Sequence, residues 1–232
     1  MFNKYLLLFF LFYLSACASF SFQKIPSEIV FQHTFQGKPF ALNMPYVTLL
    51  GDTVVFTKFK YYVSNLSLEA GQASYHLISI EDDKQADIHL AYTPQKQNLS
   101  TNFSFGIGID SLRNSKGAQT GVLDPLQGMF WTWEQGYVFL KAEGYYITNR
   151  VSFVIHIGRN QHYQMISHAA QMQDKKTKIV VQKVMVQIER LFGGYVGAAL
   201  DLPLPTKPMS IMAGEKMGLL KKNIRAMFES SR

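Results

Sequence analysis

The sequence has a single cysteine, Cys17, among its 232 residues. No intramolecular disulfide can therefore form, and a cysteine-dependent blue-copper centre or a Cys-x-x-Cys zinc site is excluded. Charged residues are also scarce, at 17%, whereas hydrophobic residues make up 47%. This balance excludes global disorder and allows a sizeable core.

The positive charge of the chain is not clustered. Lysine and arginine give a formal charge of +7, but they are scattered along the sequence. A nucleic-acid-binding protein needs a concentrated basic patch. We therefore expect no nucleic-acid partner and interpret the surplus as a feature of the surface that aids solubility.

The chain also lacks a hydrophobic run long enough to cross a membrane. The apolar run at residues 5–14 is much shorter than the roughly 20 residues that a transmembrane helix needs. With the lysine in residues 1–4, it matches a secretory signal. Residues 14–17, Leu-Ser-Ala-Cys, resemble the bacterial lipobox, in which the cysteine is acylated and becomes the first residue of the mature chain.

Cys17 is therefore the expected site of lipidation, and an ordinary signal peptide with an incidental cysteine is the alternative. We expect residues 1–16 to be a lipoprotein signal peptide and residues 17–28 to be a tether. Several acyl chains on one cysteine hold a protein firmly on a membrane. The expected location is a bacterial membrane, with the protein facing the periplasm or exposed on the cell surface.

Signatures of catalysis are mostly missing. The sequence contains no Walker-type phosphate loop and no Gly-x-Ser-x-Gly motif. The Gly-Ile-Gly stretch at residues 106–108 lacks the third glycine of a dinucleotide site. Asp124, Glu134 and Glu143 are near the tryptophans and have the chemistry for acid–base work, but nothing distinguishes them from solvated or capping residues. We expect that the chain is not an enzyme.

Short strand-like segments dominate the chain, and helical periodicity occurs only at its end. Met217, Leu220, Ile224 and Phe228 recur at three- and four-residue spacing, as in an amphipathic helix. No repeat or long linker divides the chain. We predict an all-β, antiparallel β-sandwich of immunoglobulin-like or Greek-key type over residues 29–232, with a short C-terminal amphipathic helix. The segments with strand character are residues 29–35, 40–44, 54–68, 75–80, 98–110, 128–137, 145–158 and 179–192.

Both tryptophans lie in the stretch Gly-Met-Phe-Trp-Thr-Trp-Glu-Gln-Gly-Tyr at residues 128–137. Strand alternation would place Trp131 and Trp133 on one face, with a bulge or close backbone approach at Gly136. One interpretation is a pair of core tryptophans. Another is that one indole lines a site, and a third is that Trp131, Trp133 and Tyr137 form an aromatic platform for a glycan or a protein partner.

The six histidines show no local metal-ligand spacing such as His-x-His. A site assembled from distant strands would have imidazole and thioether donors, which suits copper. His33 shares the apolar face of its strand with Phe31 and Phe35, where a neutral imidazole needs a partner. A hydrogen-bonded core histidine is the alternative for His33, and equally for His156.

Several motifs carry a resemblance to a known family. The most specific runs from Leu-Asp-Pro at residues 123–125 through the tryptophan stretch to Glu-Gly at residues 143–144. Over residues 29–229 the chain resembles the MbnP-like family of extracytoplasmic copper-binding proteins, which are related to the methanobactin-associated periplasmic protein. Supporting pieces are Phe-Gln-His at 31–33, Tyr-Tyr-Val-Ser-Asn-Leu at 61–66, Phe-Gly-Ile-Gly-Ile-Asp at 105–110, His-Ile-Gly at 156–158, and Asn-Ile with Met-Phe within 223–228.

The resemblance implies a β-sandwich that binds one copper ion. By position, His33 and His156 are the implied imidazole ligands, and Trp131 or Trp133 is the implied site of oxidation to kynurenine. The implied oxidant is a partner resembling di-haem cytochrome c peroxidases. The expected function is a lipid-anchored copper-binding protein for copper storage, delivery or sensing. The sequence departs from the family in having no cysteine after its His-x-Gly segment.

Overall fold

The computed structural model describes residues 27–67, 73–80, 87–92, 102–169 and 180–229. The predicted signal peptide, Cys17 and most of the predicted tether lie outside these ranges. Ser27 and Glu28 already belong to the first strand, so the sheet begins before the expected domain boundary at residue 29. No helix within the described ranges is both long and apolar enough to cross a membrane.

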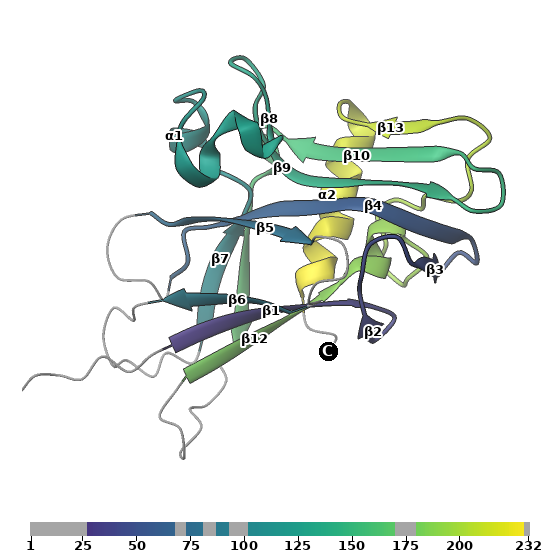
Figure 1. The fold of residues 1–232 in the computed structure, drawn as a ribbon, viewed down its shortest axis with the longest axis horizontal. Helices are drawn as coiled ribbons and strands as arrows, with labels where there is room; N and C mark the ends of the chain where they lie inside the picture. The colour runs from purple at the N-terminus through teal and green to yellow at the C-terminus, as the bar shows by residue number, and fades with distance from the viewer. Residues whose placement is uncertain (1–26, 68–72, 81–86, 93–101, 170–179, 230–232) are drawn as a thin grey trace, which may run out of the picture.

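The described residues form a β-sandwich of two sheets (Figure 1). The smaller sheet has four strands in the order β12-β1-β2, with β6 also paired to β1. The larger sheet has nine strands in the order β11-β7-β4-β9-β10-β13; β3 and β5 also pair with β4, and β8 pairs with β9. Most pairs are antiparallel, but β1 with β12 and β10 with β13 are parallel.

The strands are β1 (Ser27–Phe35), β2 (Lys38–Pro39), β3 (Pro45–Val47), β4 (Thr53–Ser64), β5 (Tyr75–Ile80), β6 (Asp87–Tyr92), β7 (Asn102–Ile107), β8 (Phe130–Thr132), β9 (Gly136–Tyr146), β10 (Ser152–Gly158), β11 (Gln164–Ala169), β12 (Val180–Gln187) and β13 (Met209–Ile211). The α-helices are α1 (Ser111–Asn114) and α2 (Glu215–Phe228). Short 3-10 helices are η1 (Gly121–Leu123), η2 (Pro125–Gln127), η3 (Asn160–His162) and η4 (Ile188–Phe192).

The two faces of the larger sheet have different chemistry. On the inner face, Tyr61 of β4 pairs with Leu140 of β9, and both are fully buried in the core. On the outer face, Lys60, Lys141 and His156 lie opposite one another on β4, β9 and β10. Because side chains alternate along a strand, these two rows point to opposite sides of the sheet.

The core contains many aromatic rings in edge-to-face contact. Phe31 of β1 meets Phe105 of β7 with ring centroids 5.3 Å apart, and Phe56 of β4 meets Phe153 of β10 at 5.4 Å. Such pairs contribute about 0.5–1.5 kcal/mol each beyond the burial of their surface. The Phe31–Phe105 pair joins the smaller sheet to the larger one, whereas Phe56 and Phe153 both belong to the larger sheet.

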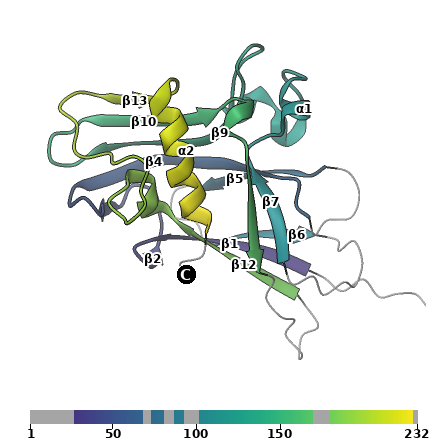
Figure 2. The ribbon, with the colours of Figure 1, turned by 180° about the vertical axis from the view of Figure 1, so that it is seen from behind.

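The C-terminal helix α2 covers the inner face of the larger sheet beside the smaller sheet (Figure 2). The ring of Phe228 packs against Tyr61 at 5.2 Å. The predicted apolar stripe is confirmed, and a polar residue, Asn223, is fully buried within it. The Asn223 side chain accepts a hydrogen bond from the Ala199 backbone N–H at 3.0 Å and donates one to the Leu200 carbonyl at 2.6 Å.

Residues 109–135, here called the cap, cover one end of the outer face. They include α1, η1, η2, β8 and the turn after it, and they bury the outer-face rings of Tyr62 and Tyr137 in a second apolar cluster. The Tyr137 hydroxyl donates to the Leu123 carbonyl at 2.6 Å, and its backbone N–H donates to Asn114 Oδ1 at 2.8 Å. The cap is therefore fixed to the sheet by buried polar contacts.

The β-sandwich with a C-terminal helix is confirmed, but several segments differ from the sequence analysis. No strand forms at residues 40–44, which lie between β2 and β3, and residues 188–192 form η4 rather than the end of a strand. The single strand expected at residues 145–158 is a hairpin, with a turn that contains Arg150 at a φ of 57°. Residues 159–169, which are not among the predicted strands, contain η3 and β11. Residues 111–121, also outside the predicted strands, begin with α1, whose first turn is capped by Asp110.

Candidate functional site

The tryptophan hairpin consists of β8 and the start of β9, joined by a turn at residues 133–135. The irregularity expected near Gly136 is present. Gly136 has a φ of 73°, and the register shifts so that Trp131 has no residue directly opposite. A bulge of this kind re-aims a side chain. Trp133 falls in the turn rather than the strand, so it does not share the face of Trp131 as alternation predicted.

The two indoles have different surroundings. Trp131 is half-buried and lies against the end of β10, where a Cβ on Gly158 would lie 2.5 Å from its six-membered ring. Its ring centroid is 6.4 Å from that of His156, with an angle of 38° between the planes. Trp133 is 74% exposed and packs its ring edge over Gly117. Only Trp131 is therefore near a predicted ligand.

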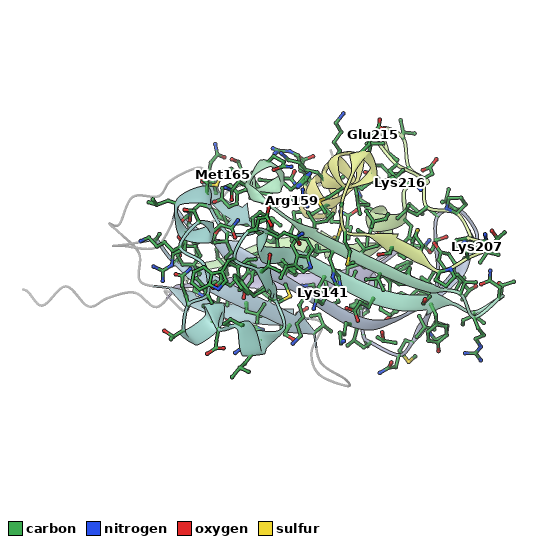
Figure 3. All side chains as sticks on the ribbon, turned by 90° about the horizontal axis from the view of Figure 1, so that it is seen from above. Lys141, Arg159, Met165, Lys207, Glu215 and Lys216 are labelled. Carbon is green, nitrogen blue, oxygen red and sulfur yellow. The ribbon has the colours of Figure 1, made fainter. Side chains whose placement is uncertain are left out.

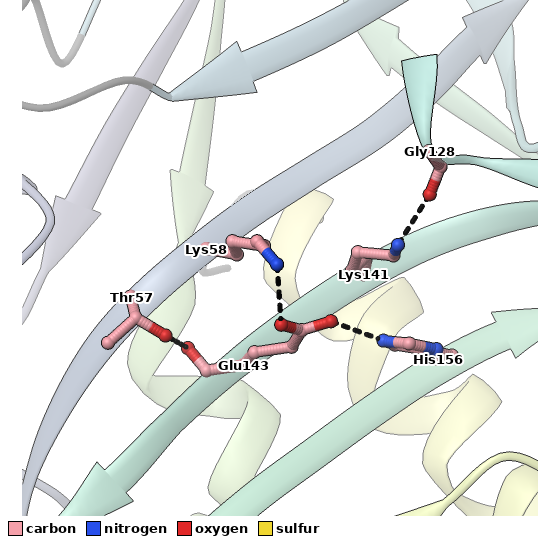
Figure 4. A network of polar contacts seen from close by, with 6 residues as sticks. All are labelled: Thr57, Lys58, Gly128, Lys141, Glu143 and His156. Carbon is pink, nitrogen blue, oxygen red and sulfur yellow. Dashed lines mark hydrogen bonds and ion pairs between the residues drawn. The ribbon is translucent and has the colours of Figure 1, made fainter. Parts of the chain in front are cut away.

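His156 belongs to a polar network on the outer face of the sheet (Figure 4). Its Nε2 lies 2.8 Å from Oε1 of Glu143, and the other carboxylate oxygen accepts from Lys58 Nζ at 3.1 Å. Lys141 Nζ donates to the carbonyl of Gly128 in the cap. Figure 3 shows Lys141 on the side of the larger sheet away from α2, which carries Glu215 and Lys216.

The surroundings set the charges of the His156–Glu143 pair. Burial lowers the pKa of His156 below its ordinary value, although the hydrogen bond with Glu143 acts in the opposite direction. Burial alone would raise the pKa of Glu143, but the hydrogen bonds from His156 and Lys58 outweigh it and hold this pKa below its ordinary value. At neutral pH the pair is therefore a neutral imidazole beside a carboxylate.

The second ring nitrogen of His156 has a different environment. Nδ1 is buried and has no hydrogen-bond partner within the described residues. Leaving a buried polar atom without a partner costs about 1–3 kcal/mol. An imidazole nitrogen with a free lone pair is a common ligand of copper and zinc. His156 therefore fits a metal ion that accepts one imidazole, although no group of three His, Cys, Asp or Glu side chains gathers in the described ranges.

His33 lies on the other side of the sheet. It is fully buried on the inner face of β1, with Nε2 at 2.9 Å from the Tyr61 hydroxyl and its ring 6.3 Å from that of Phe59. Tyr61 and His156 project from opposite faces of the larger sheet. The structure therefore does not bring the two histidines together, and the expected pair of converging imidazoles is not formed. Its surroundings are those of the hydrogen-bonded core histidine considered as the alternative.

The aromatic platform of Trp131, Trp133 and Tyr137 is not formed either. Tyr137 has no exposed surface, since its ring is enclosed by the cap and lies 4.9 Å from that of Phe130. Trp131 faces the end of β10, and Trp133 alone is largely exposed. The hypothesis of a three-ring surface for a glycan or a protein partner is therefore wrong in this form.

Glu143 is a candidate functional residue that the sequence analysis did not single out. Its position near the tryptophans drew attention to it only as one of three carboxylates. The missing signal was the turn between β9 and β10, because that turn sets the register that pairs Lys141 with His156. Glu143 is then the diagonal neighbour of His156 on the same face, within reach of its side chain.

A polar cavity of about 310 Å³ lies beyond the turn of the tryptophan hairpin. It is lined by Asn114, Glu134, Gln135, Arg159, Asn160 and Gln161. Asn114 forms part of its wall while donating to Asn160 Oδ1 at 2.7 Å. Its lining includes no histidine, so it is separate from the His156–Trp131 pair.

Comparison with known proteins gives one family and one solved structure. The family model described as MbnP matches residues 24–212. The chain of MbnP from Methylosinus trichosporium aligns with a TM-score of 0.49 and 16% sequence identity, covering 72% of this chain and 77% of that chain. A comparison with curated proteins gives no match.

Proposed function

Because this chain belongs to the MbnP family, we propose that it is an extracytoplasmic copper-binding protein whose metal site is built around His156 and Trp131. The observation that carries the proposal is the buried, unpartnered Nδ1 of His156 next to the Trp131 ring. Imidazole is a suitable ligand for copper. The proposed role is binding of copper for storage, delivery or sensing, without catalysis.

Trp131 is the proposed site of modification. Oxidation of an indole to kynurenine supplies a carbonyl and an aryl amine, which can bind a metal where the indole cannot. Trp131 is favoured over Trp133 because its ring lies beside His156, whereas Trp133 is 74% exposed over Gly117. The proposed oxidant is a separate partner resembling a di-haem cytochrome c peroxidase. Anchoring through lipidated Cys17 would place the site on the outer side of a bacterial membrane.

Copper titration of the purified domain tests the site. We expect one high-affinity copper ion per chain, lost in His156→Ala and retained in the folded fraction of His33→Ala. His33 is the matched control because it is a histidine buried between the two sheets, on β1 of the smaller sheet, whereas His156 lies on the outer face of the larger sheet. Retention of copper by His156→Ala, or its loss in folded His33→Ala, would contradict the proposed site.

Mass spectrometry of the tryptophan peptide from native cells tests the modification. Conversion of tryptophan to kynurenine adds about 4 Da to the peptide. The modified side chain would supply the new metal-binding groups, and the protein fold would only position it. We expect the added mass on Trp131 and not on Trp133. An added mass on Trp133 alone would overturn the assignment to Trp131.

A further inference from the structure

We propose that Glu143 is a positioning residue for the metal site: it keeps the proton of His156 on Nε2 and so presents Nδ1 as the metal-binding nitrogen. The inference rests on the proposed copper site. It adds which nitrogen of His156 binds the copper ion and which residue determines that nitrogen. Its structural basis is the contact between Oε1 of Glu143 and Nε2 of His156 at 2.8 Å.

The carboxylate of Glu143 is itself held in place. One oxygen faces His156, while the other accepts from Lys58 Nζ at 3.1 Å. The backbone carbonyl of Glu143 also accepts from the Thr57 hydroxyl at 3.3 Å. Because both carboxylate oxygens have partners, the group has little freedom to turn away from the imidazole (Figure 4).

The orientation of the carboxylate decides the tautomer of the imidazole. An ionised carboxylate can only accept hydrogen bonds, and a neutral imidazole has a single N–H group. Nε2 must therefore carry the proton, which leaves a lone pair on Nδ1. This is the nitrogen that is buried without a partner in the described part of the chain.

The same arrangement recurs at protein metal sites. A histidine that binds a metal through one nitrogen usually donates its other N–H to a carboxylate, a carbonyl or water, and loss of that partner typically weakens metal binding 10- to 100-fold. A purely electrostatic role for Glu143, offsetting Lys58 and Lys60 on the outer face, would leave the tautomer of His156 unaffected. A measurement of the His156 tautomer therefore distinguishes a positioning role of Glu143 from a purely electrostatic one.

Nitrogen NMR of the ¹⁵N-histidine-labelled, copper-free protein is the direct test. At neutral pH we expect the His156 signals of a ring protonated at Nε2, with Nδ1 unprotonated. On addition of Cu(I), which is diamagnetic, the Nδ1 signal should shift while Nε2 keeps its proton. A proton on Nδ1 in the copper-free protein, or a Cu(I)-induced loss of the Nε2 proton, would overturn the proposal.

A matched pair of variants tests the role of the carboxylate. Glu143→Gln replaces it with an amide that can either donate or accept, so we expect a changed tautomer signature and a 10- to 100-fold weaker affinity for Cu(I). Glu134→Gln removes the same charge from the exposed turn of the tryptophan hairpin, and we expect the wild-type tautomer and affinity.

The outcomes separate this inference from the proposed function. If Glu143→Gln keeps the wild-type tautomer and copper affinity while His156→Ala loses copper, the positioning role is wrong and the copper site stands. If His156→Ala keeps its copper, the copper site itself is wrong. If Glu143→Gln does not fold, the NMR measurement on the wild-type protein still decides the tautomer.

Discussion

At the scale of single residues, His33 and His156 both use Nε2 to contact a side chain of another strand, but His33 reaches across to the facing sheet and His156 reaches the adjacent strand β9. The chemistry of the two contacts also differs. His33 meets the hydroxyl of Tyr61, which can donate or accept, whereas His156 meets the carboxylate of Glu143, which can only accept. The first contact accommodates either tautomer and fits a core histidine. The second fixes the tautomer, which makes His156 the residue suited to bind a metal.

His33→Ala should reduce stability. The substitution leaves a cavity in the core and deprives the buried Tyr61 hydroxyl of its contact with the imidazole. We expect a loss of about 2–4 kcal/mol in the free energy of unfolding, measured by urea denaturation. Tyr61→Phe, which removes only the hydroxyl, should cost less. A His33→Ala protein as stable as the wild type would show that the buried contact contributes nothing.

Asp110 should make the stability of the protein decrease at acidic pH. Its side chain accepts from the Tyr75 hydroxyl at 2.5 Å, from Asn65 at 3.2 Å and from the backbone N–H of Arg113 at 3.0 Å. Burial alone would raise the pKa of Asp110, but these hydrogen bonds outweigh it and the pKa lies below its ordinary value. The stabilisation is therefore present above the pKa of the unfolded chain and is lost as the pH falls through the folded value.

Asp110→Asn checks this dependence. Asparagine still caps α1 but removes the charge, so we expect a loss of about 1–2 kcal/mol at neutral pH. The difference from the wild type should shrink as the pH falls below about 4, the ordinary value for aspartate. Denaturation curves at several pH values measure it. A difference that stays constant with pH would contradict the role of the charge.

At the scale of elements, the tryptophan hairpin and α1 depend on each other through Gly136 and Asn114. The Asn114 side chain accepts from the Tyr137 N–H and lies where a Cβ on Gly136 would be, at 2.4 Å. The hairpin and α1 can therefore approach each other in this way only if position 136 has no side chain. The position of Trp131 beside His156 depends on this close approach.

Gly136→Ala and Gly121→Ala form a matched pair. Both glycines have similar φ values, 73° and 70°, but an alanine Cβ at Gly121 would meet nothing within 4 Å. We expect Gly121→Ala to cost about 1 kcal/mol from backbone strain alone, and Gly136→Ala to cost about 2–4 kcal/mol because Asn114 must also move. Thermal or urea denaturation measures both, and equal losses would contradict the steric argument.

The sequence predicted a helix or strand well where the buried residues of that element are apolar and the exposed residues are polar. β1 and α2 follow their apolar patterns, and the buried residues of both include those expected. β11 was missed because its buried face carries Gln164 and His168 beside a single aliphatic residue, Ile166. The polar residues on that face hide the alternation, although they are buried. A pattern based on hydrophobicity cannot detect such a strand.

At the scale of the whole molecule, the β-sandwich class was predictable from the sequence. Which face of each sheet points into the core was not. Alternation correctly placed His33 on the apolar face of β1, but it could not show that this face meets the inner side of the larger sheet while His156 lies on the outer side. That arrangement follows from the packing of the two sheets against each other, which joins distant segments such as β1 and β4. The neighbourhood of Trp131 and His156 likewise depends on a bulge and a hairpin register.

Removal of α2 should abolish cooperative folding. Its five buried apolar residues, Met217, Leu220, Ile224, Met227 and Phe228, belong to the main core. At about 1.5–3 kcal/mol for each buried side chain, they contribute an amount comparable with the whole net stability of a domain, about 5–15 kcal/mol. A chain that ends at residue 213 should lose its cooperative thermal transition and bind a hydrophobic dye. A transition unchanged from that of the full chain would contradict this.

The parallel pairing of β1 with β12 joins residues 27–34 to residues 180–187. During synthesis, one edge of the first strand therefore stays open until almost the entire polypeptide has left the ribosome. Contacts that close such long loops form slowly. A polypeptide that folds late stays unfolded for longer. Export through a secretion channel that accepts only unfolded chains would require this state.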